Sequence, residues 1–352
     1  MNLEITIWDE WFYDSSITSS YLQNLYDSYY SNNSDDDPNE LIITKILDKY
    51  NPYINYSDYD SNDDGFIDSI WVIYDTPVNF ESEDSMFWAY TSWDYEWYSE
   101  NHQDNIDPTK ARDGVYPYYY AWGGVDFMYP EINNASYDTS SIDVDAHTYI
   151  HETGHLLGLD DYYDYNPNLG PDRGLYGADM MDANIGDHGP ISKLLLDWVD
   201  PYVAESSGNV TLAPFTTSGD FLIVSDHPLT SIYDTYYIVE FYTNDGLNAN
   251  DAPIPNGLGI RITHVHGEVN IVNGEVDFNG GKYDTSFKYD NSDTTIPFVE
   301  MLSHSSFPSD EYGYYVTSNN LYTQGKVFTS SIFDLRVVSI SSTQAVVDIT
   351  LK

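Results

Sequence analysis

The sequence contains no cysteine, so no disulfide can stabilise it and no thiolate can hold a metal ion. Any zinc site in this chain must therefore be built from histidine and carboxylate ligands. With 352 residues, the chain is long enough to bury a large core without covalent cross-links. The absence of cysteine thus excludes disulfide-rich scaffolds and thiolate zinc sites, and leaves the compartment open.

Basic residues are also scarce. The chain has 12 Lys and Arg against 58 Asp and Glu, which gives a formal net charge of -46. Nucleic acids and anionic lipid surfaces are bound through a basic surface, so both classes of partner are excluded. Clustered carboxylates repel one another unless cations compensate, and hard cations such as calcium prefer oxygen ligands. The composition therefore predicts cation binding.

Long apolar runs are missing as well. No stretch approaches the length of a membrane-spanning helix, and Met1–Asp14 lacks the basic and apolar regions of a signal peptide. We expect no membrane insertion. Either the protein is intracellular or its targeting segment precedes this sequence. Richness in Tyr, Asn, Asp and Ser with few Lys is typical of exported proteins, so we favour the second alternative and expect a secreted or cell-surface protein.

The first half of the chain has a mixed pattern. A helical period with an early proline covers residues 37–47, and an apolar strand is predicted at 69–74. The aromatic stretch 80–140 does not divide clearly into elements. A helix is predicted from Ser141 to Leu157, with apolar positions that include Val144 and Ile150, and Gly158 would end it.

The second half changes to short apolar or alternating runs separated by turn residues. These predicted strands lie at 210–212, 221–224, 236–241, 259–263 and 345–351. The pattern is typical of a β-sandwich. We predict an α+β protein with a catalytic domain at 1–205 and a β-sandwich-like domain at 206–352 packed on it.

The segment from His151 to His155 reads His-Glu-Thr-Gly-His, the HExxH pattern of zinc peptidases. Residues four positions apart share one face of a helix, so both imidazoles can reach one zinc ion. Glu152 would then act as general base toward a water molecule that zinc activates. The predicted reaction is hydrolysis of peptide bonds. The short motif also occurs by accident on solvated helices, so it needs further support.

A third protein ligand has to come from outside this helix. Gly158 permits a sharp turn back toward the metal, and Asp161 follows at the spacing of the HExxHxxGxx(H/D) pattern of metzincin-like peptidases. Asp160 and Asp164 are competing carboxylates. Spacing favours Asp161, so we predict that it completes the zinc site with the two histidines.

Further blocks follow in order: His151–Asp164 is succeeded by Ala178–Met181 and then by Pro190–Val199. An acidic block, Tyr59–Asp68, lies upstream, and Gly257–Val265 lies downstream. In order and spacing, these blocks resemble the immune inhibitor A family of secreted bacterial zinc metallopeptidases. The likeness covers most of the chain, and its most specific part is the zinc motif.

This resemblance implies an extracellular endopeptidase with zinc, structural calcium and a β-sandwich after the catalytic part. By position, it implies that His151, His155 and Asp161 are ligands. It also implies that Glu152 is the base and that Met181 lies beneath the metal. The chain departs from the family at Asp160, where proline is common, which leaves Asp160 as an alternative to Asp161. The signal and propeptide that family precursors carry have no counterpart in this sequence.

An EF-hand-like loop is predicted at residues 60–68. Oxygen-bearing side chains stand at loop positions one, three, five and nine, with Gly65 at six, as in calcium loops. Trp71 stands at position twelve instead of a bidentate Glu, so we expect structural calcium rather than a switch. The predicted calcium residues are Asp60, Asn62, Asp64, Phe66 and Asp68. The alternative is an acidic turn without an ion.

Three other histidines are candidates for lesser roles. His188, shortly after Met180 and Met181, could bind substrate or stabilise the oxyanion, or could belong to an ordinary surface loop. His264 and His266, near a strand end, are expected to be packed or hydrogen-bonded rather than bound to metal.

Taken together, the sequence predicts a monomeric zinc metalloendopeptidase that acts on protein or peptide substrates. One alternative is a catalytically silent surface binding or adhesion module that keeps the peptidase fold. The intact Glu152 argues against it, because loss of the base is the usual mark of an inactive homologue. A second alternative is a structural domain of a larger cell-surface protein.

Overall fold

A computed structural model describes residues 11–32, 37–78, 85–93, 110–129, 144–164, 174–249, 251–267, 270–272, 275–277, 291, 297–310 and 313–352. The chain forms two compact units, Met1–Leu156 and Leu157–Lys352. Several sheets and a few helices make up the described part, which confirms the predicted α+β class. Within this described part, no helix is both long and apolar enough to cross a lipid bilayer.

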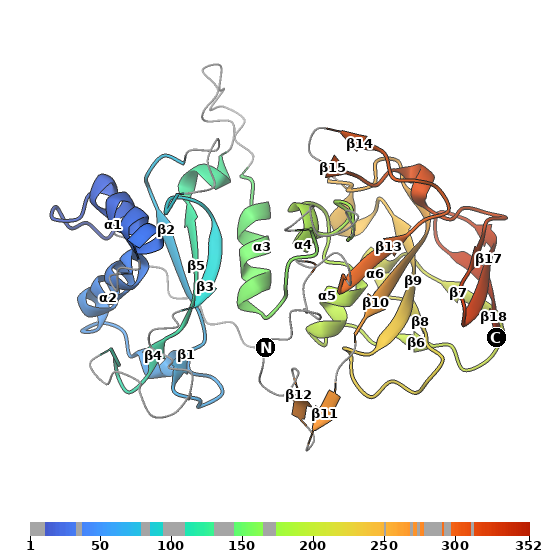
Figure 1. Ribbon diagram of the computed structural model, residues 1–352, viewed down its shortest axis with the longest axis horizontal. Coiled ribbons are helices and arrows are strands. Elements are labelled where there is room, and N and C mark those ends of the chain that lie inside the picture. The colour runs from blue at the N-terminus through green and yellow to red at the C-terminus, as the bar shows by residue number, and fades with distance from the viewer. Residues whose placement is uncertain are drawn as a thin grey trace. The chain divides into compact units, whose positions relative to one another are not determined.

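The first unit is built on a three-stranded sheet with the order β2-β5-β3. Strands β2 (Ile70–Tyr74) and β5 (Tyr119–Gly124) are parallel, and β3 (Tyr90–Trp93) pairs with β5 in the antiparallel sense. Helices α1 (Ser19–Asn32) and α2 (Pro38–Tyr50) cover one face of this sheet, and α3 (His147–Leu156) lies on the other (Figure 1). The predicted strand at 69–74 is thus confirmed.

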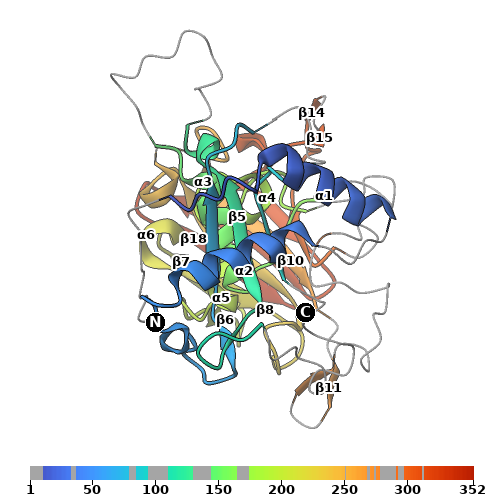
Figure 2. The ribbon, with the colours of Figure 1, turned by 90° about the vertical axis from the view of Figure 1, so that its left-hand side faces the viewer.

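Helices α1 and α2 run side by side over the sheet (Figure 2). Asp37 caps α2, because its side chain accepts a hydrogen bond from Asn39 N at 2.8 Å, and Pro38 fills the first turn. The predicted helix at 37–47 is therefore confirmed. A core of apolar side chains joins both helices to the sheet: Leu22, Ile42, Ile43, Leu47, Val72, Tyr74, Tyr120 and Trp122. Smaller elements complete the unit: η1 (Tyr56–Tyr59), η2 (Val125–Met128), and the parallel pair β1 (Phe66–Ile67) and β4 (Tyr116–Pro117).

Helix α3 begins at His147, later than the predicted start at Ser141, which lies outside the described residues. Residues 144–146 are not helical, and Asp145 accepts a hydrogen bond from His147 N at 2.9 Å. The apolar residues from which this helix was predicted do not lie on its buried face either. Ile150 is 43% exposed and Val144 is 58% exposed, whereas the buried residues of this helix are His151, Glu152 and Gly154.

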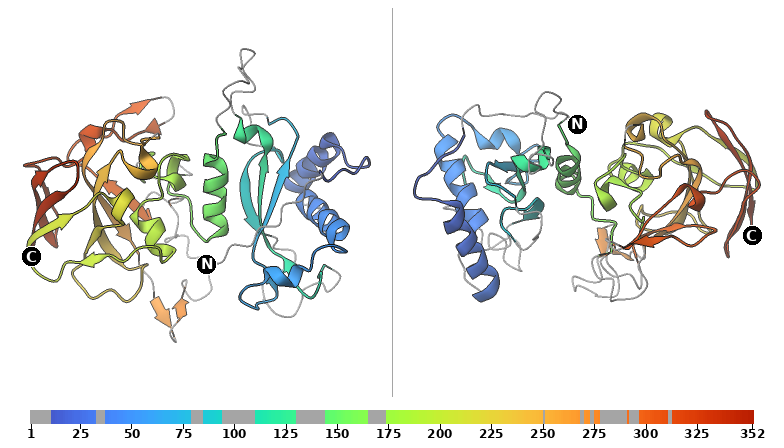
Figure 3. Two further views of the ribbon diagram at one scale, coloured as in Figure 1. Left: turned by 180° about the vertical axis from the view of Figure 1, so that it is seen from behind. Right: turned by 90° about the horizontal axis from the view of Figure 1, so that it is seen from above.

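The second unit contains a five-stranded sheet, order β13-β10-β9-β8-β6, and a four-stranded sheet, order β16-β17-β18-β7. The two sheets stack face to face (Figure 3). Apolar side chains from both sheets fill the space between them: Leu222, Val224, Val239, Phe241, Ile260 and Ile262 from one, and Leu335, Val337, Val347 and Ile349 from the other. The strands predicted from the alternating runs are all present.

Strand bounds in the five-stranded sheet are β6 (Tyr202–Val203), β8 (Phe221–Val224), β9 (Thr235–Thr243), β10 (Leu258–His266) and β13 (Val299–Leu302). The four-stranded sheet contains β7 (Gly208–Leu212), β16 (Val327–Thr329), β17 (Phe333–Ile340) and β18 (Ala345–Leu351). Two small hairpins are β11 (Asn270–Val272) with β12 (Glu275–Asp277), and β14 (Ser309–Asp310) with β15 (Gly313–Tyr314). The short helices are α4 (Met180–Ala183), α5 (Pro190–Leu195), α6 (Phe215–Ser218), η5 (Gly246–Asn248) and η7 (Ser318–Asn320).

The other face of the five-stranded sheet is covered by the chain that precedes it. Leu159, Tyr162, Met181 and Ile191 pack in one core with side chains of β8, β9, β10 and β13. The sheet is therefore buried on both faces. The two compact units divide at Leu156/Leu157. The functional division into domains 1–205 and 206–352 remains a prediction.

A buried charge cluster connects that covering segment to the sheet. Arg261 on β10 donates from Nε to Oε1 of Glu240 on β9, and from Nη1 to the carbonyl oxygen of Ala178 at 2.5 Å. Asp179, at the start of α4, is close enough to Arg261 for the positive charge of Arg261 to favour the charged form of its carboxyl group. The exposed fractions of Asp179, Glu240 and Arg261 are 0%, 1% and 4%, so solvent does not screen these charges.

We predict that Arg261→Met destabilises the protein strongly, because it leaves two buried carboxylates without their cation. Removing one partner from a buried ion pair costs about 3–5 kcal/mol. The control is Arg336→Met, at an exposed position of β17, which should change stability by less than about 0.5 kcal/mol. Urea unfolding followed by circular dichroism measures both. Equal shifts for the two variants would contradict the structural role of Arg261.

Candidate metal centre

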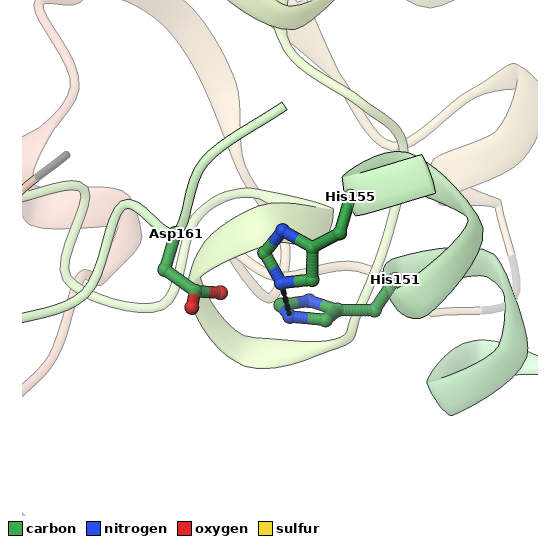
Figure 4. A group of neighbouring side chains, drawn as sticks. All are labelled: His151, His155 and Asp161. Atoms are coloured by element: carbon green, nitrogen blue, oxygen red, sulfur yellow. Dashed lines mark hydrogen bonds between the residues drawn. The ribbon is translucent and has the colours of Figure 1, made fainter. Parts of the chain in front are cut away.

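His151, His155 and Asp161 come together in the structure (Figure 4). Each offers one ligand atom, and these atoms all lie within 4.8 Å of one another. The Nε2 atoms of the two histidines are 3.1 Å apart. His151 and Asp161 are buried, whereas the competing Asp160 is exposed. Among the residues that the structure describes, this is the one such cluster of three metal-ligating side chains.

The donor types of this cluster, and the separation of its two imidazole nitrogens, fit a zinc ion. Zinc binds imidazole nitrogen and carboxylate oxygen at about 2.0–2.2 Å, so two ligands of a tetrahedral site lie about 3.3 Å apart. The separation of 3.1 Å between the two Nε2 atoms is close to that value. Three protein ligands would also leave one coordination position open, as in catalytic rather than structural zinc sites.

Helix α3 is fixed to the sheet of the first unit by polar side chains. The hydroxyl of Tyr149 donates to Gly124 O at 2.6 Å, at the end of β5. Trp71 on β2 donates from Nε1 to Thr153 Oγ1 at 3.3 Å, and its ring lies 5.2 Å from that of Tyr149. Because these contacts come from α3 residues before and between the histidines, they fix which face of α3 presents the imidazoles.

Glu152 is buried, at 6% exposed, and lies against the edge strand β3. The hydroxyl of Thr91 is 2.9 Å from the carbonyl oxygen of Glu152 and 3.0 Å from its Oε2, with geometry to donate to either. A glutamate is seldom fully buried, so the burial of Glu152, which lies between the two histidines in sequence, is a signal of function. Thr91 is a site residue that sequence reasoning missed, because nothing in residues 80–140 marked β3.

The loop after α3 turns at Gly158, whose φ of +94° is in the region that favours glycine. Tyr162, fully buried, then anchors the segment: its backbone N donates to Met181 O at 2.9 Å. Asn291 holds the same stretch from a distant part of the sequence. Its Nδ2 donates to Tyr162 O at 2.6 Å, and its backbone N donates to Asp161 O at 3.3 Å. These contacts orient Asp161, and Asn291 carried no sequence signal.

Met181 lies next to this segment and is fully buried. Asp179 shapes its turn, because its carboxylate accepts hydrogen bonds from Met181 N at 2.9 Å and Gly189 N at 2.7 Å. Burial raises the pKa of Asp179 to about 6, although Arg261 and the two amide donors favour the charged form. Any Cβ on Gly189 would lie 2.4 Å from the Asp179 carboxylate, so this position requires glycine. The predicted place of Met181 beneath the metal remains a prediction.

His188 is half-buried in the loop between α4 and α5, with its ring 6.4 Å from that of Trp198. It is not one of the three clustered side chains, and its predicted role in substrate or oxyanion binding remains a prediction. His264 is packed as expected, stacked on Tyr237 with ring centroids 4.2 Å apart. Burial, with His266 nearby, lowers the pKa of His264 to about 4. The side chain of His266 faces Glu300 at 3.6 Å.

The predicted calcium loop at residues 60–68 forms a compact turn that includes β1 and precedes β2. Asp60 accepts hydrogen bonds from Asp64 N at 3.0 Å and Gly65 N at 2.9 Å, and Asp64 accepts from Phe66 N at 2.9 Å. Asp68 accepts from Ser61 N, at 3.2 Å to Oδ1, and Gly65 has a φ of +89°. These bonds account for much of the loop's shape without an ion. The calcium residues therefore remain a prediction.

No protein-family model matches this chain, and no curated protein matches it either.

We predict that Asp161→Ala lowers the zinc content of the purified protein, because it removes a buried ligand. Loss of one of three protein ligands should reduce affinity at least about tenfold. Asp160→Ala is the matched control, since it removes an exposed carboxylate one residue earlier and should retain zinc. Metal analysis after dialysis against a weak chelator gives the occupancy of each variant. The reverse result would move the third ligand by one residue.

Proposed function

We propose that this chain is a zinc-dependent endopeptidase that hydrolyses peptide bonds in proteins. The observation that carries the proposal is the joint placement of His151, His155 and Asp161, with the buried carboxylate of Glu152 on the same helix. A structural zinc site needs no base, whereas a hydrolytic site needs both an open coordination position and a group that moves a proton.

The chemistry divides between the ion and the chain. Zinc, when bound, supplies a Lewis acid that polarises the scissile carbonyl and makes water more acidic. His151, His155 and Asp161 would hold the ion. Glu152 would accept the proton of the attacking water and later donate it to the departing amine. Burial of Glu152 keeps bulk water from competing for that proton transfer.

Protein substrates are favoured over small ones by the position of β3. This strand is at the edge of its sheet and contacts α3, so an extended peptide could add to it as a further strand. Strand addition recognises backbone rather than one particular side chain, which suits cleavage within exposed protein segments. The metzincin-like domain, the β-sandwich-like domain that follows, and the resemblance to the immune inhibitor A peptidases belong to the same proposal, as do secretion and a monomeric state.

The main alternative is a binding or adhesion module without turnover. It predicts the same folded chain and the same metal, so only catalysis separates the two. The buried Glu152 favours the enzyme, since an inactive binding module has no need to keep a carboxylate in this position.

We predict that Glu152→Ala retains zinc but loses at least about a thousandfold in kcat, since the base is removed and no ligand is changed. Cleavage of casein and of a peptide library, each with and without a chelator, measures the loss. Glu205→Ala, at an exposed position, is the control and should keep wild-type activity. Cleavage by Glu152→Ala at the wild-type rate would contradict the assigned mechanism.

We also propose that calcium binds the turn at residues 60–68 and stabilises the fold. A net charge of -46 makes the compact state repel itself, and an ion that binds only the folded state offsets this. Asp60, Asn62, Asp64 and Asp68 become adjacent only when the turn before β2 has formed. Calcium would therefore favour folding through this loop.

Calcium at a hundredfold excess over its dissociation constant should add about 2.7 kcal/mol of stability and raise the melting temperature. Magnesium at the same ionic strength is the control for charge screening, and it should raise the melting temperature less than calcium does. The double variant Asp60→Ala, Asp64→Ala should lose much of the response to calcium. Equal effects of the two ions, with the response intact in the double variant, would show that the loop is only an acidic turn.

A further inference from the structure

Thr91 makes two contacts with one residue of α3. Its Oγ1 lies 2.9 Å from the backbone carbonyl oxygen of Glu152 and 3.0 Å from Oε2 of the Glu152 side chain. A hydroxyl carries a single hydrogen, so it can donate to only one of these acceptors at a time. Both acceptors belong to Glu152, so either hydrogen bond restrains the position of that residue.

The backbone of Thr91 is held firmly enough to serve as a fixed point. Thr91 pairs with Ala121 of β5, a fully buried residue in the middle of the sheet. Strand β5 also receives the hydrogen bond from Tyr149 of α3 at Gly124 O. Strand β3 and helix α3 are therefore both attached to β5. A β-branched side chain such as that of Thr also has few rotamers available.

A glutamate side chain has several rotatable bonds and would sample many orientations if nothing held its carboxylate. When ionised, the carboxylate is a stronger acceptor than the carbonyl oxygen, so the hydroxyl donates to Oε2 and restricts that rotation. A general base acts only when its oxygen lies within hydrogen-bond reach of the proton that it takes. Restricting the carboxylate therefore increases the fraction of molecules in which Glu152 is placed to take that proton.

We propose that Thr91 is a positioning residue for the general base. Its hydroxyl holds the Glu152 carboxylate through Oε2 and does not act on the metal or on the scissile bond. This role rests on the proposed peptidase function. It also predicts a division between variants: removal of the hydroxyl lowers turnover, whereas a change that keeps the hydroxyl preserves it.

Thr91→Val is the sharpest variant, because valine has nearly the same shape and β propensity and lacks only the hydroxyl. We expect kcat to fall about tenfold, which corresponds to about 1.4 kcal/mol, with KM within about twofold of wild type and zinc content unchanged. Thr91→Ser should restore kcat to within about threefold. Thr211→Val, the same change at an exposed position of β7, is the matched control and should leave kcat unchanged.

A second readout does not depend on catalysis or on zinc. In the metal-free protein labelled with 13C at the glutamate carboxyl carbon, the Glu152 resonance is assigned by its loss in Glu152→Gln. We expect this resonance to shift in Thr91→Val and to keep its wild-type position in Thr91→Ser and Thr211→Val. Should Thr91→Val fail to fold, as judged by circular dichroism, Thr91→Ala provides the same deletion of the hydroxyl.

The outcomes separate this role from the peptidase function. An active wild-type protein whose Thr91→Val variant keeps the wild-type kcat would overturn the role of Thr91 alone. An unshifted Glu152 resonance in Thr91→Val would overturn the contact itself. A wild-type protein that binds zinc and cleaves no peptide would overturn the peptidase function, and with it the catalytic meaning of the contact.

Discussion

The candidate metal centre depends on the attachment of helix α3 to the sheet beneath it. Two imidazoles spaced four residues apart can meet on one ion only if their face of the helix is turned to the right place. Tyr149, Thr153 and Glu152 set that rotation through hydrogen bonds to β5, β2 and β3. The result reverses the usual amphipathic order, because polar His151 and Glu152 are buried and apolar Ile150 is exposed.

Asp161 is not on helix α3, and its position is fixed by other polar groups, which are themselves buried. Asn291 and Met181 O fix the backbone of Asp161 and Tyr162, and Asp179 fixes the turn that contains Met181. Arg261 then ties this turn to the centre of the five-stranded sheet through Ala178 O and Glu240. Such groups are costly to bury unless they are paired, and here each is paired and lies against a sheet that is covered on both faces. This arrangement holds Asp161 in one position.

The sequence predicted the elements whose signal is local. The cap at Asp37, the apolar runs of β8 and β18, and the spacing of His151, His155, Gly158 and Asp161 each depend on a few neighbouring residues, and the structure contains all of them. The start of α3 was predicted too early, because Val144 was counted as a core position. Val144 is exposed, residues 144–146 are not helical, and the side chain of Asp145 accepts a hydrogen bond from His147 N at the start of the helix. Thr91 and Asn291 could not be predicted, because their importance comes from contacts with residues far away in the sequence. The predicted roles of the calcium loop and of His188 also came from local patterns, and they remain predictions.

The most direct test of the central claim is the location of zinc in a crystal of this protein. An anomalous difference map recorded at the zinc absorption edge should contain a peak about 2.0–2.2 Å from Nε2 of His151, Nε2 of His155 and a carboxylate oxygen of Asp161. A map from protein that binds one zinc per chain in solution, but with its peak at other residues, would contradict the account.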